Sequence, residues 1–382
     1  MNIKDFTNPL ARQALSAPSF MNAMLDILNN EKLVRLLSVK EIWDAQQIII
    51  TGCGDSWLAG IAAVPVFESV AKMDVEVMRC VEFSRFFGSK RLGYSPNTPL
   101  VIGISISGAV SRVIEALRRA NHYGANTIAI TDDPLSPAAR EAKHALILNL
   151  PKDYEYMPGG NSYIASTLAL MQIALRFARA KNTMNPEELE NIQRELRDYA
   201  AAWRTLDIDE RCFALARVYK DLRAYDFIGD YADYATAFFG SAKVLECFGG
   251  YTTYDDSEGW CHINFYLSGP ETIGRVIIAN SDTPSFGRLK ETINTIRNMK
   301  SPAIVVSDAE KNEFGPPGPN FDVFTTPKAP RFWFSPLLQH IPFDLVAGYI
   351  GKLKGKADFR ADNPLFKSLG SRRIRESLIK II

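Results

Sequence analysis

Residues 48–56 constrain the fold of this chain more than any other stretch. They read Ile-Ile-Ile-Thr-Gly-Cys-Gly-Asp-Ser and precede a helical pattern over 57–70. A short β-branched run that ends in Gly-x-Gly predicts a buried strand turning sharply into a helix. The glycines allow a tight turn and let a ligand approach the backbone closely. Asp55 or Ser56 can cap the helix, whose free N–H groups and dipole favour an anion.

The same pattern recurs about fifty residues later. Residues 100–105 form a second apolar run, followed by Ser107-Gly108 and a helical pattern over 110–123. Two strand-to-helix turns rich in Ser and Gly, within one α/β unit, predict a pocket for a small phosphorylated or polyhydroxylated ligand.

Strand and helix patterns alternate through the first half of the chain. A helical segment, with a helix expected to start at Pro18, precedes the first strand. This alternation predicts a parallel sheet with helices on both faces. The predicted strands are 47–51, 75–79, 100–105, 127–131 and 145–150.

The second half of the chain resembles the first. Segments 226–229, 275–279 and 303–306 match 48–52, 100–104 and 127–130 at an offset of about 175 to 178 residues. Three matches at one offset predict a tandem duplication of one α/β unit. We therefore expect an N-terminal helical segment (1–45), a first domain (46–183), linking helices (184–222), a second domain (223–355) and a C-terminal tail (356–382).

Composition excludes several classes of function. The formal net charge of the 382 residues is +1, so there is no basic excess for nucleic acid or an anionic membrane surface. The five cysteines are scattered without a Cys-x-x-Cys pair, which disfavours a disulfide framework or a metal site. There is neither an apolar signal core nor a run of eighteen apolar residues. We expect a cytoplasmic protein with reduced thiols, no metal and no cofactor.

The two turns, together with the strand at 125–132, resemble the SIS (sugar isomerase) domain. The tandem arrangement over roughly 15–375 is similar to the isomerase half of glucosamine-6-phosphate synthase and to fructosamine-6-phosphate deglycases. The resemblance implies two tandem doubly wound, flavodoxin-like domains in a homodimer with the site at the subunit boundary. The length leaves no room for a glutaminase domain ahead of these repeats, so we do not expect a complete synthase.

The resemblance also implies which residues bind the sugar: Gly52, Cys53, Gly54, Ser56, Ser105, Ser107, Gly108, Ser111, Asn161 and Ser166. Among them, Ser56 matches the family serine that contacts the sugar phosphate. The second turn departs from the family, with Ile106, Ala109 and Val110 in place of Gln, Glu and Thr. Its two serines remain, so two hydroxyls and a helix N-terminus are still available to an anion.

Three residues of the second half are the catalytic candidates that the resemblance implies. Glu246 would be the base, His262 the ring-opening acid reaching a neighbouring subunit's site, and Lys367 the carbonyl-binding or Schiff-base lysine. The apolar neighbours of Glu246 in sequence would raise its pKa if the carboxylate is buried. Each candidate also has a purely structural interpretation: an i,i+3 ion pair of Glu246 with Lys243, a structural histidine, and a solvated lysine.

The leading hypothesis is an aldose–ketose isomerase or deglycase that acts on a sugar phosphate or aminosugar phosphate through an enediol or enamine. The alternative is a carbohydrate-binding or regulatory protein without catalysis, which the altered second turn favours. A dinucleotide-binding oxidoreductase is disfavoured because the first turn reads Gly-x-Gly-x-x-Leu.

Overall fold

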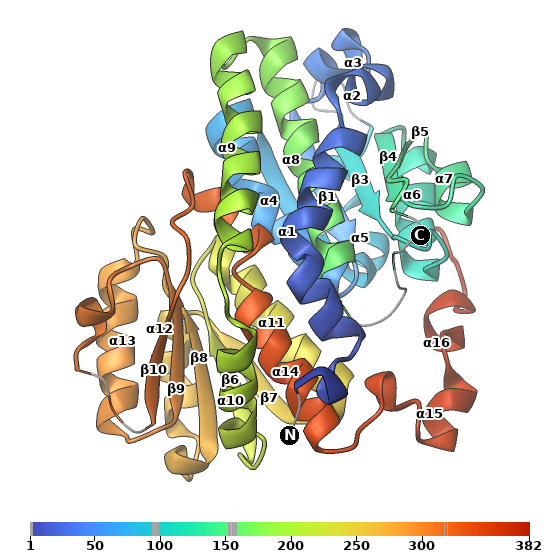
Figure 1. Cartoon of the computed structure of the whole chain (residues 1–382). Helices are drawn as coiled ribbons and strands as arrows, with labels where there is room; N and C mark the ends of the chain where they lie inside the picture. Colours follow the sequence, from blue (N-terminus) through green and yellow to red (C-terminus); the bar gives the residue numbers. More distant parts are fainter. Residues whose placement is uncertain (1–2, 94–98, 152–153, 155–158, 317, 319) are drawn as a thin grey trace. The chain divides into compact units, whose positions relative to one another are not determined.

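The computed structural model describes residues 3–93, 99–151, 154, 159–316, 318 and 320–382 (Figure 1). The chain divides into two compact units. The first-sheet unit comprises 20–154, 162–194 and 369–382, and the second-sheet unit comprises 1–19, 155–161 and 195–368.

The first-sheet unit is built on a five-stranded parallel sheet. Its strands are β1 (Gln47–Gly52), β2 (Asp74–Arg79), β3 (Leu100–Ile104), β4 (Asn126–Thr131) and β5 (His144–Ile147). Their spatial order is β2-β1-β3-β4-β5, the order of a flavodoxin-like sheet. The direction of winding reverses between β1 and β3, which are direct neighbours with Thr51 opposite Gly103. The predicted parallel α/β fold is confirmed.

Helices cover both faces of this sheet because successive side chains of a strand point to opposite sides. Ile49 and Val101 pack with Phe83 of α5 (Cys80–Arg85) and Ala116 of α6 (Ser111–His122). Ile50, on the opposite face, lies against α4 (Asp55–Val66). The strands β1 and β3 are therefore buried on both faces, which explains their uninterrupted apolar sequences.

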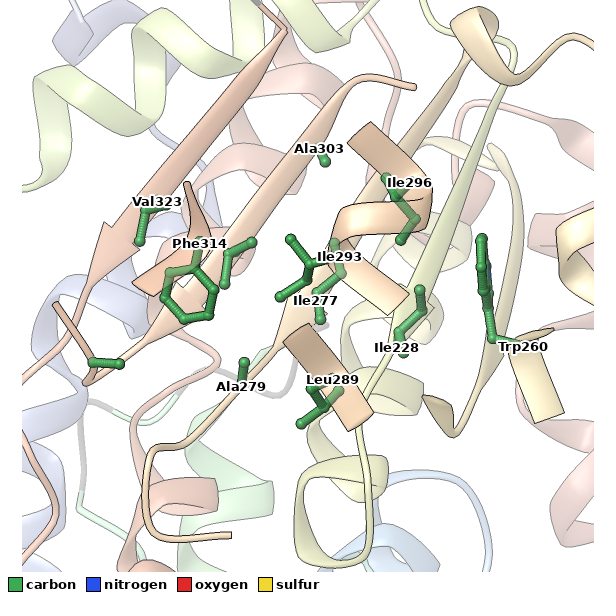
Figure 2. Close-up of a cluster of buried hydrophobic side chains, with 12 residues drawn as sticks. Ile228, Trp260, Ile277, Ala279, Leu289, Ile293, Ile296, Ala303, Phe314 and Val323 are labelled. Atoms are coloured by element: carbon green, nitrogen blue, oxygen red, sulfur yellow. The ribbon is translucent and has the colours of Figure 1, made fainter. Parts of the chain in front are cut away.

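The second-sheet unit holds another five-stranded parallel sheet. Its strands are β6 (Ala224–Ile228), β7 (Tyr251–Asp255), β8 (Ile273–Ile278), β9 (Ala303–Ser307) and β10 (Phe321–Thr325). The order β10-β9-β8-β6-β7, taken from its β7 edge, repeats that of the first sheet. Figure 2 shows the apolar layer on one face, where Ile277 packs against Leu289 and Ile293 of α13 (Phe286–Asn298). On the other face, Phe227 contacts Phe343 of α14 (Ile341–Leu353).

One predicted helix boundary is wrong. The first long helix, α1, begins at Pro9 and carries Pro18 in its interior, although we expected Pro18 to start it. The upstream turns form because Ala11, Ala14 and Ala17 present a fully buried face of strong helix formers.

The α-helices whose bounds have not yet been given are α1 (Pro9–Ile27), α2 (Asn30–Leu36), α3 (Val39–Asp44), α7 (Pro137–Glu141), α8 (Asn161–Lys181), α9 (Pro186–Arg204), α10 (Asp209–Tyr219), α11 (Ala232–Phe248), α12 (Ser257–His262), α15 (Pro364–Leu369) and α16 (Arg372–Arg375).

None of the helices in the described part of the chain has the length and apolar character needed to span a bilayer.

Candidate functional site

The first turn joins β1 to α4 and depends on two glycines. A side chain at Gly52 would lie 2.8 Å from the backbone carbon of Ser56, so only glycine fits there. Gly54 has φ +55° and ψ −130°, and its carbonyl accepts hydrogen bonds from the amides of Trp57 (2.9 Å) and Leu58 (3.1 Å). Gly54 is therefore the N-cap of α4, which corrects our assignment of that position to Asp55 or Ser56.

The second turn joins β3 to α6 and is held by neighbouring backbone. The amide of Ser105 donates to Ile130 (3.0 Å), and the amide of Gly108 donates to the carbonyl of Ser105 (2.8 Å). The carbonyl of Ile106 accepts hydrogen bonds from Thr131 Oγ1 (3.0 Å) and from the amide of Asp132 (2.9 Å). These bonds give the turn a defined shape although its residues differ from the family pattern.

Neither α4 nor α6 has a side-chain hydrogen bond at its N-cap in the described structure. The two helices follow β1 and β3, so both N-termini lie at the carboxyl edge of the sheet where the winding reverses. In open α/β sheets ligands bind in the crevice at this point. Uncapped N–H groups and the helix dipoles favour an anion there.

Two buried hydroxyls predicted to bind the ligand have no hydrogen-bond partner within the described residues. Ser105 is 3% exposed and Ser166 is 1% exposed, and the Oγ of each is unpaired. Buried polar atoms in folded proteins are nearly always satisfied, so an unpaired one requires a specific explanation. Ser107 differs: it is half-buried, and its Oγ accepts the amide of Ala109 at 3.4 Å.

Ser111, by contrast, already has a partner. Its Oγ donates to the carbonyl of Arg375 at 2.6 Å. The tail segment 369–382 packs along α6, where the amide of Lys380 donates to Glu115 (2.6 Å) and Arg119 donates to the carbonyl of Ile382 (2.8 Å). The structure thus assigns the Ser111 hydroxyl to a contact with the tail.

Asn161 begins α8 and belongs to the second-sheet unit. Its amide donates to Oε1 of Gln13 at 3.2 Å, and its own Oδ1 is buried without a partner among the described residues. Glu155, the carboxylate nearest to this segment in the sequence, lies outside the described residues.

Glu246 forms an ion pair on α11. Its Oε2 lies 2.7 Å from Nζ of Lys243, which in turn lies 4.4 Å from the centre of the Phe239 ring. The Lys243 side chain is 1% exposed and that of Glu246 is 30% exposed, while Leu245 points outward. The Glu246 carboxylate is therefore only partly buried. The i,i+3 ion pair of its structural interpretation is present.

His262 lies at the end of the short helix α12. Its side chain is 73% exposed, and its Nε2 lies 3.0 Å from Oε1 of Glu258. The helix is anchored by Trp260, which is fully buried and donates from Nε1 to Asp226 at 2.6 Å. Asp226 also forms a buried ion pair with Arg275. The result is an exposed imidazole on a firmly held helix.

Lys367 is an exposed residue of α15. The three catalytic candidates therefore lie on three separate helices of the second-sheet unit, α11, α12 and α15. Among the described residues, His262 contacts Glu258 and the amide of Lys367 donates to the carbonyl of Asn363.

One polar cluster of the second-sheet unit was not anticipated. Asp233 is buried at the second position of α11, with the Nδ2 of Asn280 2.7 Å from both carboxylate oxygens and the Nε2 of Gln339 2.7 Å from one of them. Burial raises the pKa of Asp233 to about 7. Asp233 lies 177 residues after Ser56, which is the second position of α4. The repeat offset is the sequence signal that could have identified this residue.

Comparison with known proteins identifies a matching domain family and similar enzymes. Residues 41–176 match the SIS domain family. The glutamine–fructose-6-phosphate aminotransferase (isomerizing) of Clostridium tetani is 28% identical over 326 residues, which cover 84% of this chain and 51% of that protein. The corresponding enzyme of Halobacterium salinarum is 25% identical over 297 residues, covering 76% of this chain and 46% of that protein. The chain thus spans about half the length of the curated relatives it matches.

A solved structure extends the likeness to the whole fold. The C-terminal domain of glucosamine-fructose-6-phosphate aminotransferase from Francisella tularensis has a TM-score of 0.81 at 18% identity, covering 92% of this chain and 98% of that one. The resemblance expected from the two turns is confirmed. Residues 41–176 thus match the SIS domain family, and most of the chain resembles the glutamine–fructose-6-phosphate aminotransferases.

Proposed function

We propose that this chain binds a sugar phosphate or aminosugar phosphate at the carboxyl ends of β1 and β3 and interconverts its aldose and ketose forms. The observation that carries the proposal is the unpaired hydroxyl of Ser105, buried in the turn after β3. This turn joins β3, the neighbour of β1, to helix α6. Neither α6 nor α4, the helix that follows β1, has a side-chain hydrogen bond at its N-cap in the described structure. A phosphate supplies several acceptor oxygens for such donors.

The corresponding edge of the second sheet is unsuited to an anion, which supports placing the ligand on the first. We propose that the two sheets are copies of one duplicated unit, supported by their common strand order and the 177-residue offset. Where the first copy has Ser56, the second has the carboxylate of Asp233, held by Asn280 and Gln339. Asp230 in the same turn accepts from the amide (2.7 Å) and hydroxyl (2.9 Å) of Ser257. These two acidic side chains present acceptor oxygens to a ligand, which disfavours a phosphate at this edge.

The proposed reaction moves one proton between two carbons of the open-chain sugar. His262 would donate a proton to the ring oxygen as the ring opens. Glu246 would then take the proton from C2 and return it to C1 through an enediol or enamine. Lys243 would orient the base through its 2.7 Å contact, and Lys367 would bind the carbonyl. The exposed imidazole of His262 supports a homodimer in which it completes the neighbouring subunit's site.

The second candidate function is ligand binding without turnover. The loss of Gln, Glu and Thr at positions 106, 109 and 110 favours it, as does the distribution of the three catalytic candidates over separate helices. Both candidates require the anion site, and only the first requires chemistry.

Two measurements separate these functions. Thermal unfolding of the full chain should shift upward with fructose 6-phosphate or glucosamine 6-phosphate and not with the unphosphorylated sugars, because a ligand stabilises only the state it binds. Incubation in deuterated water should then introduce deuterium at C1 or C2 of the bound sugar. A shift without exchange would favour the binding protein. No shift with any phosphorylated sugar would refute both.

A further inference from the structure

Two cysteines follow neighbouring strands of the first sheet. The parallel strands β1 and β2 are paired up to Gly52 opposite Arg79. Cys53 and Cys80 are the next residue on each strand. Neighbouring strands lie about 4.8 Å apart, within the roughly 4.4–6.8 Å that separates the Cα atoms of a disulfide. The backbone therefore places this pair where a disulfide can form without a large movement.

The two thiols differ in environment in the way that a peroxide-sensitive pair requires. Cys53 is exposed, and the pKa of its thiol is lowered, chiefly by a hydrogen bond from Cys80 and also by the nearby Arg112 guanidinium. Cys80 is fully buried, and its Sγ lies 3.5 Å from Thr51 Oγ1. Its pKa is raised, chiefly by the same hydrogen bond, with burial adding to the effect. A thiolate is the reactive form, so Cys53 would react first and Cys80 second.

We propose that Cys53 and Cys80 are a redox pair in which hydrogen peroxide oxidises Cys53, and Cys80 then closes a disulfide across the first turn. In the first step the Cys53 thiolate takes one oxygen from peroxide and becomes a sulfenic acid, releasing hydroxide, which a proton converts to water. In the second, the Cys80 sulfur attacks the Cys53 sulfur and a second water leaves. Two thiols thus lose two electrons to one peroxide, and dithiothreitol restores them.

The other three cysteines are poorly placed for this chemistry. Cys212 and Cys247 are buried in the second-sheet unit, and burial raises the pKa of each thiol. Cys261 is half-buried and lies 3.7 Å from the hydroxyl of Thr292. Cys261 therefore serves as the internal comparison for accessibility.

The disulfide would also affect ligand binding, an effect that rests on the proposed function. Cys53 stands between Gly52 and Gly54, in the turn whose backbone is proposed to approach the phosphate. Linking it to Cys80 at the start of α5 would hold that turn in one position. We expect the oxidised chain to show a smaller thermal shift with fructose 6-phosphate than the reduced chain.

Peptide mapping of the full chain tests the pair directly. After treatment with hydrogen peroxide and blocking of free thiols, trypsin should release peptide 41–72 linked to peptide 80–85, two hydrogen atoms lighter than their sum. Cys80→Ser should abolish the link and leave a Cys53 sulfenic acid that dimedone traps. Cys53→Ser should abolish both products, and Cys261→Ser should change neither.

Two results would overturn the proposal: no linked peptide in the native chain, or a Cys53 that is alkylated no faster than Cys261. The thermal-shift measurement with fructose 6-phosphate can give a negative result without affecting the redox pair. If the link forms and neither form shifts with fructose 6-phosphate, the redox pair stands and the proposed function falls. If the link forms and both forms shift equally, the redox pair stands and its effect on binding is refuted.

Discussion

Nζ of the buried Lys243 lies 2.7 Å from Oε2 of the partly exposed Glu246, one turn later on α11. The ammonium also lies 4.4 Å from the centre of the Phe239 ring. A buried ammonium is costly unless it is paired, so this contact stabilises the helix and also directs the carboxylate. The same pair can serve structure and chemistry, and only a variant that keeps the hydrogen bond separates the two.

Glu246→Gln is that variant. The amide oxygen can still accept from Lys243, so we expect a folded protein that binds fructose 6-phosphate as tightly as before. It cannot accept a proton from C2, so deuterium exchange into the bound sugar should fall by on the order of 10²–10⁴. The control is Glu210→Gln, which alters an exposed carboxylate of α10 and should leave exchange unchanged. Normal exchange in Glu246→Gln would remove Glu246 from the mechanism.

Ser105→Ala tests the anion site. Replacing an unpaired buried hydroxyl with hydrogen breaks no hydrogen bond within the described residues, so the free energy of unfolding should stay the same or rise slightly. Affinity for fructose 6-phosphate should fall roughly 10- to 100-fold, since a hydrogen bond to a charged group is worth about 1.5–3 kcal/mol. Calorimetric titration and urea unfolding measure the two quantities.

Ser84→Ala is the matched control for that experiment. Ser84 lies on α5, is fully buried and has an unpaired hydroxyl, but it belongs to neither turn. It should leave the affinity unchanged, and the free energy of unfolding should stay the same or rise slightly, as in Ser105→Ala. An equal loss of affinity in both variants would show that the effect of Ser105 is indirect.

Tyr231→Gly should relieve backbone strain. Tyr231 has φ +54° and ψ −113°, almost the angles of Gly54 at the equivalent position of the first sheet. A bulky residue held there costs on the order of 1–3 kcal/mol. We expect Tyr231→Gly to be more stable than Tyr231→Ala by about 1 kcal/mol after the extra entropy of unfolded glycine is subtracted. Both variants lose the ring, so their difference in urea midpoint reports the backbone alone. If Tyr231→Ala is as stable as Tyr231→Gly or more stable, the backbone at this position is not strained.

Stability should depend on pH through Asp233. Burial raises the pKa of its carboxyl to about 7, above the unfolded value, so the native state keeps a proton that the unfolded chain has lost. The stabilisation is complete below about pH 4 and is lost as pH rises toward 7, with a slope of at most about 1.4 kcal/mol per pH unit. Asp233→Asn should flatten the unfolding free energy between pH 5 and 7, while the exposed Asp207→Asn should leave its slope unchanged. If the unfolding free energies of wild type and Asp233→Asn depend on pH in the same way, the pKa of Asp233 is not raised.

Local sequence was a reliable guide to the sheets and their turns. The runs at 48–50 and 100–102 are apolar at every position because both faces of a central parallel strand are covered by helices. Gly52 and Gly54 are equally local, since the first has no room for a side chain and the second has a positive φ. These features depend on a few neighbouring residues and so leave a pattern in the chain.

Contacts between distant residues left no such pattern. The apolar neighbours of Glu246 in sequence left the burial of its carboxylate open, and in the structure Leu245 is exposed while Lys243 is buried. Ser111 was assigned to the ligand, and its hydroxyl bonds the carbonyl of Arg375, 264 residues later. Asp226 and Arg275 each interrupt an apolar strand, and only pairing makes two buried charges acceptable there.

The sequence by itself therefore determined the α/β class, the two glycine-dependent turns and the likeness to SIS proteins, because strand burial and backbone angles are set by adjacent residues. The tertiary structure alone decided which polar groups from distant segments are satisfied. It bonds Ser111 to the tail and Asp233 to Asn280, and it leaves the Ser105 hydroxyl without a partner among the described residues. Hydrogen bonds and ion pairs depend on distances between atoms that the fold brings together from remote segments, and those distances appear only once the chain is folded.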